Sequence, residues 1–195
     1  MRIRWLLLLL SLVATALQAV IAEDAFDGDH RTEREAVANL EAYAYFKSGD
    51  HDAARAIWER LAEAGNTTAM WNLANLLQQR YDSPGDNKKA LEYIRAAAES
   101  GDPRAQHELG IAYEKGTVLE RDLKQASDWL LRSARQNYAD SQLALGILLA
   151  TEYGRGVEFV TPANRRQALI WLRRATQEGS EEAKNYIKIL EAQNP

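Results

Sequence analysis

One pattern recurs along this chain at a spacing of 36 residues, and it constrains the fold more than any other feature. Four segments that we interpret as tight turns begin at Gly65, Gly101, Asn137 and Gly179. The first three begin 36 residues apart, and the fourth begins 42 residues after the third, so six extra residues lie within the last repeat. Periods of this length are typical of solenoids, in which each unit buries its apolar face against the next.

Other positions follow the same period. Alanine lies three residues before a large side chain, and a leucine followed by a small residue comes after each of the first three turns. These positions are Ala54, Ala90, Ala126 and Ala168; Ile57, Tyr93, Trp129 and Trp171; and Leu73-Ala74, Leu109-Gly110 and Leu145-Gly146. Small residues let helix axes approach closely, and we expect the large residues to fill the space beside them.

Each unit is therefore predicted to be a helix, a loop, a second helix and a tight turn, with glycine or asparagine in the left-handed conformation at the turn. Asp102-Pro103 reads as an N-cap followed by proline at the first helical position. The predicted helices are Thr32–Ser48, Asp52–Ala64, Thr67–Gln79, Asn87–Ser100, Pro103–Lys115, Asp122–Gln136, Ala139–Thr151, Asn164–Glu178 and Glu181–Gln193. The fold class is all-α, a solenoid of stacked antiparallel helix pairs.

The chain begins with a segment that has the layout of a secretory signal peptide. Arg2 and Arg4 precede an apolar run, and small residues at Val20 and Ala22 suit a cleavage site before Glu23. We expect residues 1–22 to be removed, residues 23–31 to form an acidic tether, and the protein to be periplasmic or secreted. The alternative is an uncleaved membrane anchor, although 18 residues interrupted by polar side chains are marginal for a spanning helix.

Charge and cysteine content narrow the possible functions. Cleavage would remove two of the 24 basic residues and none of the 28 acidic ones, so the formal net charge would fall from −4 to −6. Binding to nucleic acid or to an anionic membrane needs clustered basic residues, so neither is expected. With no cysteine in the chain, there can be no disulfide and no thiolate chemistry, and stability must come from packing.

The repeated residues resemble the Sel1-like repeat, a relative of the tetratricopeptide repeat that is common in bacteria. The central repeat matches this family at Ala105, Leu109, Gly110, Tyr113, Gly116, Asp122, Ala126, Trp129 and Ala134. The resemblance divides the chain into a tetratricopeptide-like helix pair at 32–66, Sel1-like repeats at 67–102, 103–138 and 139–180, the last with a loop insertion, and a capping helix at 181–195. It implies an exported bacterial protein with a right-handed superhelix that assembles or regulates protein complexes.

The resemblance also implies which side chains face the concave groove. By register with the tetratricopeptide repeat, the first helix of each pair presents these candidate partner-binding residues: Asn39, Tyr43, Phe46, Trp71, Asn75, Gln78, His107 and Ile111. Exposed aromatic side chains beside amide groups suit the capture of a protein or peptide. The alternative is that the aromatic residues pack against the preceding helix or the tether.

No catalytic constellation is evident, so we expect a non-enzymatic adaptor with no cofactor and no metal. The three histidines are far apart, and Asp50-His51-Asp52 falls at a turn between helices, where an N-capping role is sufficient. The predicted partner is a protein or peptide, with no nucleic acid and no stable membrane insertion after cleavage; the oligomeric state stays open. Two alternatives are a protein that binds or hydrolyses cell-wall fragments and a membrane-anchored subunit of an envelope complex.

Overall fold

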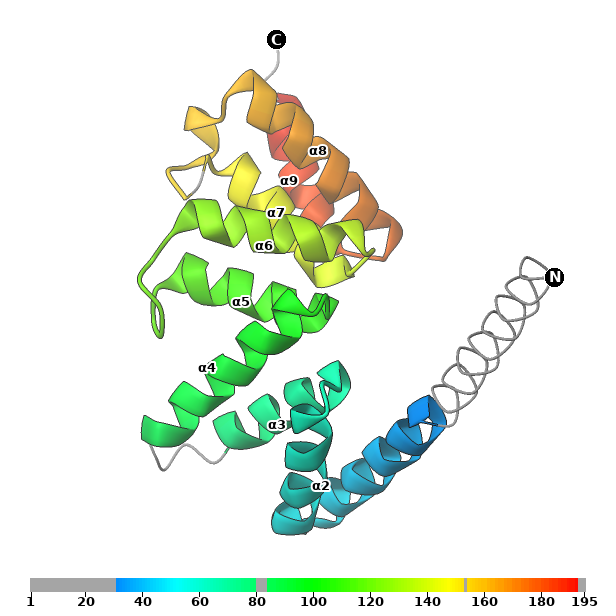
Figure 1. The fold of residues 1–195 in the computed structure, drawn as a ribbon. Coiled ribbons are helices and arrows are strands. Elements are labelled where there is room, and N and C mark those ends of the chain that lie inside the picture. The colour runs from blue at the N-terminus through cyan, green and yellow to red at the C-terminus, as the bar shows by residue number, and fades with distance from the viewer. Residues whose placement is uncertain (1–30, 80–83, 153, 193–195) are drawn as a thin grey trace, which may run out of the picture. The chain divides into compact units, whose positions relative to one another are not determined.

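A computed structural model describes residues 31–79, 84–152 and 154–192, and every regular element in these ranges is a helix (Figure 1). The chain divides into two compact units at Asn66. The predicted signal peptide and most of the predicted tether lie outside the described residues, and Arg31, which we had assigned to the tether, is already helical. None of the helices described is long and apolar enough to cross a membrane.

The first unit contains a helix over residues 31–48 followed by α2 (His51–Glu63). Gly49 has a φ of 87°, a left-handed conformation that glycine adopts readily at the turn between the two helices. The Asp50 carboxylate then accepts a hydrogen bond from the Ala53 backbone N–H at 3.1 Å, which caps the start of α2. A short turn between the two helices was predicted here, and the structure has one.

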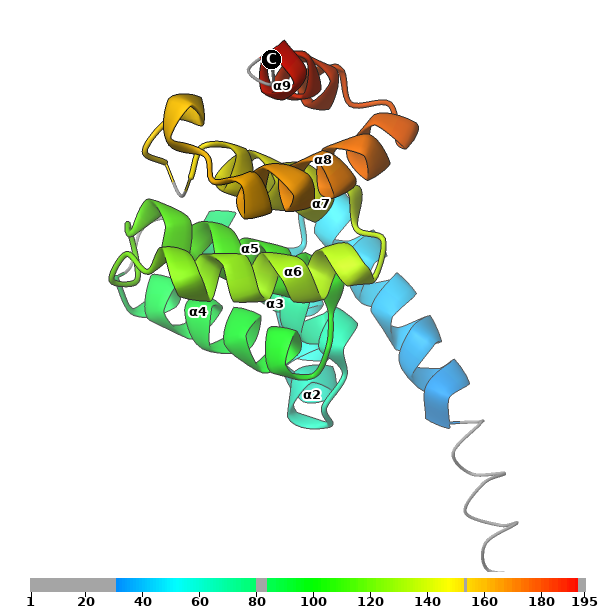
Figure 2. The same cartoon turned by 90° about the horizontal axis from the view of Figure 1, so that it is seen from above.

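The second unit contains the remaining helices, which pack as successive antiparallel pairs (Figures 1 and 2). They are α3 (Thr67–Gln79), α4 (Pro84–Glu99), α5 (Pro103–Lys115), α6 (Leu123–Arg135), α7 (Ala139–Ala150), α8 (Pro162–Gln177) and α9 (Glu181–Ala192). Helix α3 pairs with α4, α5 with α6, and α7 with α8, while α4 packs on α5 and α6 on α7. The final helix α9 packs on both α7 and α8.

The residues predicted to form the turns and helix caps of the second unit have the expected conformations. Gly101 and Gly179 have φ values of 99° and 94°, and Asn137 takes the same left-handed region with a φ of 64°. Asp102 caps α5 by accepting hydrogen bonds from the backbone N–H groups of Arg104 and Ala105, at 2.9 and 3.3 Å. These contacts satisfy N–H groups that have no partner inside the helix.

Two helix starts were predicted two or more residues too late. Helix α4 begins at Pro84 instead of Asn87, and α8 begins at Pro162 instead of Asn164, capped by the Thr161 hydroxyl. Proline suits the first turn because its fixed φ is already helical and the N–H it lacks would have no partner there. The predicted loop before α8 also contains a short 3₁₀ helix, η1 (Val157–Phe159).

The small residues predicted to allow close helix packing are buried in the core, but the side chains packed against Gly110 and Gly146 differ from the predicted ones. Ala54, Ala90, Ala126 and Ala168 are all fully buried. A Cβ on Gly110 would lie 2.8 Å from Leu130 Cγ, and one on Gly146 would lie 2.8 Å from Leu172 Cγ. The side chain that fills this space is therefore the leucine that follows Trp129 or Trp171 in sequence.

The two tryptophans differ in burial. Trp171 is buried, whereas Trp129 is half-buried, with the Arg132 guanidinium 4.3 Å from its ring centroid. The expectation that both tryptophans fill the core is thus wrong for Trp129, which lies at the edge of the core, where its ring can stack against a charged side chain.

Candidate partner-binding groove

Asn39, the first predicted groove residue, takes part in a hydrogen-bond network inside the first unit. Its Nδ2 donates to the Glu35 carbonyl and to Asn66 Oδ1, both at 3.1 Å, and Asn66 in turn donates to the Glu35 carboxylate at 2.9 Å. The hydrogen bond from Asn66 and the hydrogen-bonded ion pair with Arg31 lower the pKa of Glu35, although burial opposes this. The network joins the helix over residues 31–48 to the end of the unit, which gives Asn39 a structural role.

The two aromatic candidates of the first unit lie in different environments. The Phe46 ring is half-buried, with centroids 5.3 Å from His51, 5.8 Å from the buried Trp58 and 6.2 Å from Tyr43. Tyr43 is 50% exposed. Phe46 therefore packs against α2, the helix that follows it, instead of the preceding helix or the tether of the alternative interpretation, and Tyr43 presents more of its ring to solvent.

In the second unit, Trp71 on α3 lies beneath a fixed cation. The Arg104 guanidinium is 5.5 Å from the Trp71 ring centroid, and the Asp102 carboxylate holds Arg104 by hydrogen bonds of 2.6 and 3.1 Å. Asn75 donates from Nδ2 to the Trp71 carbonyl at 3.0 Å. Trp71 is half-buried, so it offers one part of its ring to the solvent and another to the protein.

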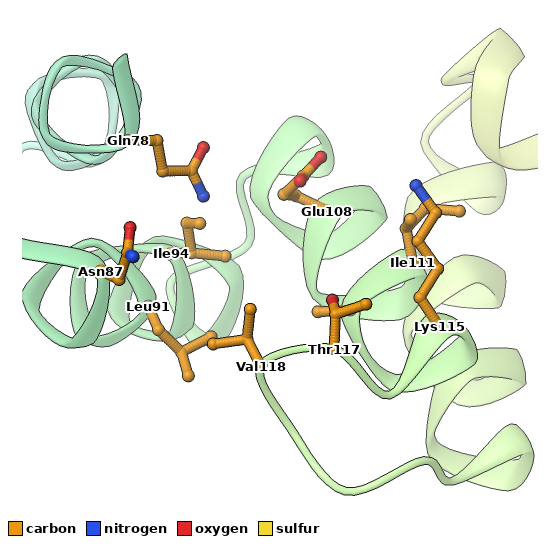
Figure 3. A pocket seen from close by; sticks show the side chains of 10 residues that line it. Gln78, Asn87, Leu91, Ile94, Glu108, Ile111, Lys115, Thr117 and Val118 are labelled. Carbon is orange, nitrogen blue, oxygen red and sulfur yellow. The ribbon is translucent and has the colours of Figure 1, made fainter. Parts of the chain in front are cut away.

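Two of the predicted residues line a pocket with a volume of about 270 Å³, which we call the first pocket (Figure 3). Gln78 reaches it from α3, and Ile111 from α5. The other lining residues are Asn87, Leu91 and Ile94 of α4, Glu108, Ala112 and Lys115 of α5, and Thr117 and Val118 of the following loop. Its walls combine an apolar surface with side chains that can both donate and accept hydrogen bonds.

His107 lines a second pocket, of about 320 Å³, between α5 and α7. Glu114 joins it from α5, and Asp140, Leu143, Ala144 and Ile147 come from α7. Because α5 contributes side chains to both pockets, it lies between them, with the residues of the two pockets on adjacent faces of one helix.

A chain of buried hydroxyl groups determines which nitrogen of His107 carries the proton. The Ser133 hydroxyl donates to the Pro103 carbonyl at 2.6 Å, because a carbonyl can only accept. The Ser141 hydroxyl must then donate to Ser133, 2.7 Å away, which uses its only hydrogen. His107 Nδ1, 2.9 Å from the Ser141 oxygen, therefore donates to it, and Nε2 is left as an acceptor.

Burial favours the neutral form of this histidine. Desolvation lowers the pKa of His107 below its usual 6.5, and the carboxylates of Asp140 and Glu108 oppose this effect. The His107 ring also contacts Tyr138, with centroids 5.4 Å apart. Burial raises the pKa of the Tyr138 hydroxyl, and the nearby Asp140 carboxylate adds to that shift.

The groove also contains residues that the sequence interpretation missed. Asn87 and Leu91 come from a second helix and Val118 from a loop, which the register of the first helices cannot indicate. Leu143 and Ile147 lie 36 residues after His107 and Ile111, so extending the same register by one repeat would have indicated both. Val118, which is 60% exposed, was detectable as a bulky apolar residue in a polar loop. Within the described ranges, no three histidine or acidic side chains are grouped to hold a metal ion.

Comparison with known proteins identifies structural relatives. A Sel1 repeat protein from Oxalobacter formigenes superposes with a TM-score of 0.70 at 26% identity, over 80% of this chain and 45% of that one. A protective antigen with an SLR fold, present in uropathogenic Escherichia coli strains, gives 0.65 at 28% identity, over 76% of this chain and 32% of that one. This chain thus spans less than half the length of these relatives, and no curated protein matched it.

The Sel1 repeat family matches residues 67–102, 103–138 and 139–180, the three helix pairs of the second unit. The structural relatives carry the same solenoid fold, which confirms the resemblance seen in the sequence. Solenoids of Sel1 repeats generally serve as scaffolds for protein–protein interaction. On the repeats and the fold together, the chain belongs to the Sel1 repeat family.

Proposed function

We propose that the chain is a non-enzymatic adaptor that binds an extended segment of a protein partner across α5. The observation that carries this proposal is the pair of pockets on adjacent faces of that helix, with volumes of about 270 and 320 Å³. Each offers apolar surface, Leu91, Ile94 and Val118 in the first pocket and Leu143 and Ile147 in the second. An extended peptide that crosses α5 could place one side chain in each.

The side chains between the pockets suit this mode of binding. Glu108 and Lys115 border the first pocket, and His107 and Glu114 border the second, all on α5. Polar groups around an apolar centre are the arrangement found at protein interfaces, where they orient the partner and the buried apolar side chains provide most of the affinity. Trp71, under Arg104, offers a further aromatic contact on α3.

The adaptor is proposed to act in the periplasm or outside the cell. This part of the proposal comes from the N-terminal sequence alone, in which a basic start and an apolar run precede small residues. Mass spectrometry of the protein purified from a bacterial host that secretes it would give the N-terminus. A mature chain that begins at Glu23 supports export with cleavage, and an intact residue 1 in membrane fractions would contradict it.

Selection of peptides from a random display library against the purified protein tests the binding proposal. Val118→Asp places a charge in the first pocket at an exposed position, so the fold should tolerate it. We expect selected peptides to lose at least about tenfold in affinity, because one apolar side chain would no longer be buried. Ile189→Asp is the matched control, since Ile189 is also exposed and apolar but lies on α9.

Comparison of the two variants distinguishes binding in the groove from nonspecific binding to exposed apolar residues. Peptides that bind the wild type and Ile189→Asp equally, and Val118→Asp much less, support the proposed groove. A library that yields no binders, or binders that respond equally to both substitutions, contradicts it. Thermal unfolding monitored by circular dichroism should give the same midpoint for all three proteins, which excludes loss of fold as the cause.

A further inference from the structure

We propose that the second pocket receives a lysine or arginine side chain of the partner. The inference rests on the proposed function, because it names the chemistry that one part of the groove selects. It arises from two properties of the residues between α5 and α7: an apolar floor and a set of polar groups that can only accept hydrogen bonds.

The floor suits a long aliphatic stem. Leu143, Ala144 and Ile147 lie on one side of α7, with Ile147 four residues after Leu143 and three after Ala144, and all are partly exposed. Ala144 is the small residue of this set, beside the two larger side chains. Lysine and arginine pack their methylene groups along such a surface while keeping the charged head at its edge.

The polar groups around this floor are all acceptors. Glu114 and Asp140 carry carboxylates, and the Nδ1 proton of His107 is committed to Ser141, which leaves Nε2 as a lone-pair acceptor. No other polar side chain lines the pocket. Ammonium and guanidinium groups have only donors, so they match this set, whereas a carboxylate or phosphate of a partner would meet two like charges.

Two cations, Arg104 and Lys115, lie near these carboxylates, but neither lines the second pocket. Arg104 is bound by Asp102 and lies over Trp71, and Lys115 lines the first pocket. At His107, the negative charges of Asp140 and Glu108 are opposed by the smaller effect of the positive charge on Lys115. The selection for a cation therefore belongs to the second pocket, and the first pocket, with Gln78, Asn87, Thr117 and Lys115, contains donors as well.

Two small probes that differ in a single group test the proposal by NMR. The wild-type protein, with ¹³C-labelled isoleucine methyl groups, is titrated with N-acetyl-lysine methylamide and with N-acetyl-norleucine methylamide, whose side chain lacks the ammonium. Ile147 reports on the second pocket, and Ile94 and Ile111 report on the first. We expect the Ile147 methyl signals to move with the lysine probe, with about fivefold higher affinity than for norleucine, as two exposed ion pairs would provide.

Charge removal supplies the matched variants. The double variant Glu114→Gln/Asp140→Asn keeps the shape of the pocket but removes both negative charges. Its preference for the lysine probe over the norleucine probe should therefore disappear. Glu99→Gln/Glu178→Gln removes two exposed carboxylates that line neither pocket, and the preference should remain. Equal affinity for both probes, a preference that survives in Glu114→Gln/Asp140→Asn, or shifts confined to Ile94 and Ile111 would each overturn the proposal.

The outcome is separable from that of the proposed function. Displayed peptides that are sensitive to Val118→Asp but insensitive to loss of the carboxylates would keep the groove and refute the cation pocket. An Ile147 response to the lysine probe with no selected peptide would refute a peptide as the source of the side chain. A basic residue at a fixed position among the selected peptides, lost when the library is selected on Glu114→Gln/Asp140→Asn, supports both.

Discussion

The close approach of α5 and α6 at Gly110 allows a sharp test of the packing. In Gly110→Ala, the new Cβ would lie 2.8 Å from Leu130 Cγ, 3.0 Å from Leu130 Cδ2 and 3.3 Å from the Ala126 carbonyl oxygen. Leu130 is fully buried, so it has little freedom to move aside. We therefore expect alanine, the best helix former, to destabilise a helix in which it replaces glycine.

Two opposing terms determine the size of the effect. Alanine favours the helix by about 1 kcal/mol over glycine, and forcing one extra carbon into a packed core costs roughly 1–3 kcal/mol. The net change expected for Gly110→Ala is a loss of about 1 kcal/mol in the free energy of unfolding. Without the clash, the same substitution would add about 1 kcal/mol, so the sign of the measured change distinguishes the two cases.

The chain itself indicates how to relieve the clash. At the positions 36 residues earlier, Ala74 takes the place of Gly110 and Ile94 takes the place of Leu130, and both are buried. Isoleucine branches at Cβ, whereas leucine branches at Cγ, the atom that the new alanine Cβ would approach, so isoleucine places its methyl groups differently beside α5. Moving this pair into the second repeat, as Gly110→Ala/Leu130→Ile, should recover most of the stability that Gly110→Ala loses.

Urea unfolding followed by circular dichroism at 222 nm measures all four proteins of the cycle: wild type, each single variant and the double variant. Repeat proteins can unfold in parts, so the comparison uses transitions with equal urea dependence. We expect a coupling free energy of about 1–2 kcal/mol between the two positions. If Gly110→Ala in the wild-type protein raises the free energy of unfolding, the close approach described above is refuted. Additive effects of the two substitutions would refute it as well.

Two further predictions concern single side chains. Burial lowers the pKa of His107 in the folded protein, so the unfolded chain binds the imidazole proton more tightly. The contribution of neutral His107 to stability is therefore complete above the unfolded pKa of 6.5 and is lost as the pH falls below it. We expect the unfolding midpoint of His107→Gln to vary less with pH in that window than the midpoint of the wild type. Phe46→Ala should lower the free energy of unfolding by about 2 kcal/mol, roughly half the cost for a fully buried ring. Tyr43→Ala should change it by less than about 0.5 kcal/mol, because the Tyr43 ring is more exposed. Equal losses in urea unfolding would mean that the packing of Phe46 does not stabilise the first unit.

The sequence indicated the helices well because their signals are local. Turns at Gly101 and Asn137, with Asp102 as a cap, mark where α5 begins and where α6 has ended, and the bounds of α3 and α5 match the prediction to the residue. The errors at α4 and α8 have one cause, since Pro84 and Pro162 were assigned to loops although proline is favoured at the start of a helix.

The groove was predictable only in part, because its walls combine residues from different repeats. Register placed Gln78, His107 and Ile111 on the groove side of their helices, and all three line pockets. It could not separate Tyr43 from Phe46, because the exposure of each ring depends on how the turn at Gly49 brings His51 and Trp58 against one of them. A residue can therefore be assigned to a face from sequence, but its availability to a partner depends on the neighbouring helix.

The hydroxyl chain behind His107 is not required by the fold. At the positions equivalent to Ser133, the neighbouring repeats have Ala97 and Ala175, and at those equivalent to Ser141 they have Ala105 and Ala183, all buried. A buried hydroxyl group in place of alanine is tolerated only if it is hydrogen-bonded, and here Ser133 donates to the Pro103 carbonyl while Ser141 donates to Ser133. They occur together in the one repeat junction where a histidine lies beside them, so their shared consequence is a fixed tautomer of His107, a property that serves binding at the groove more directly than packing in the core.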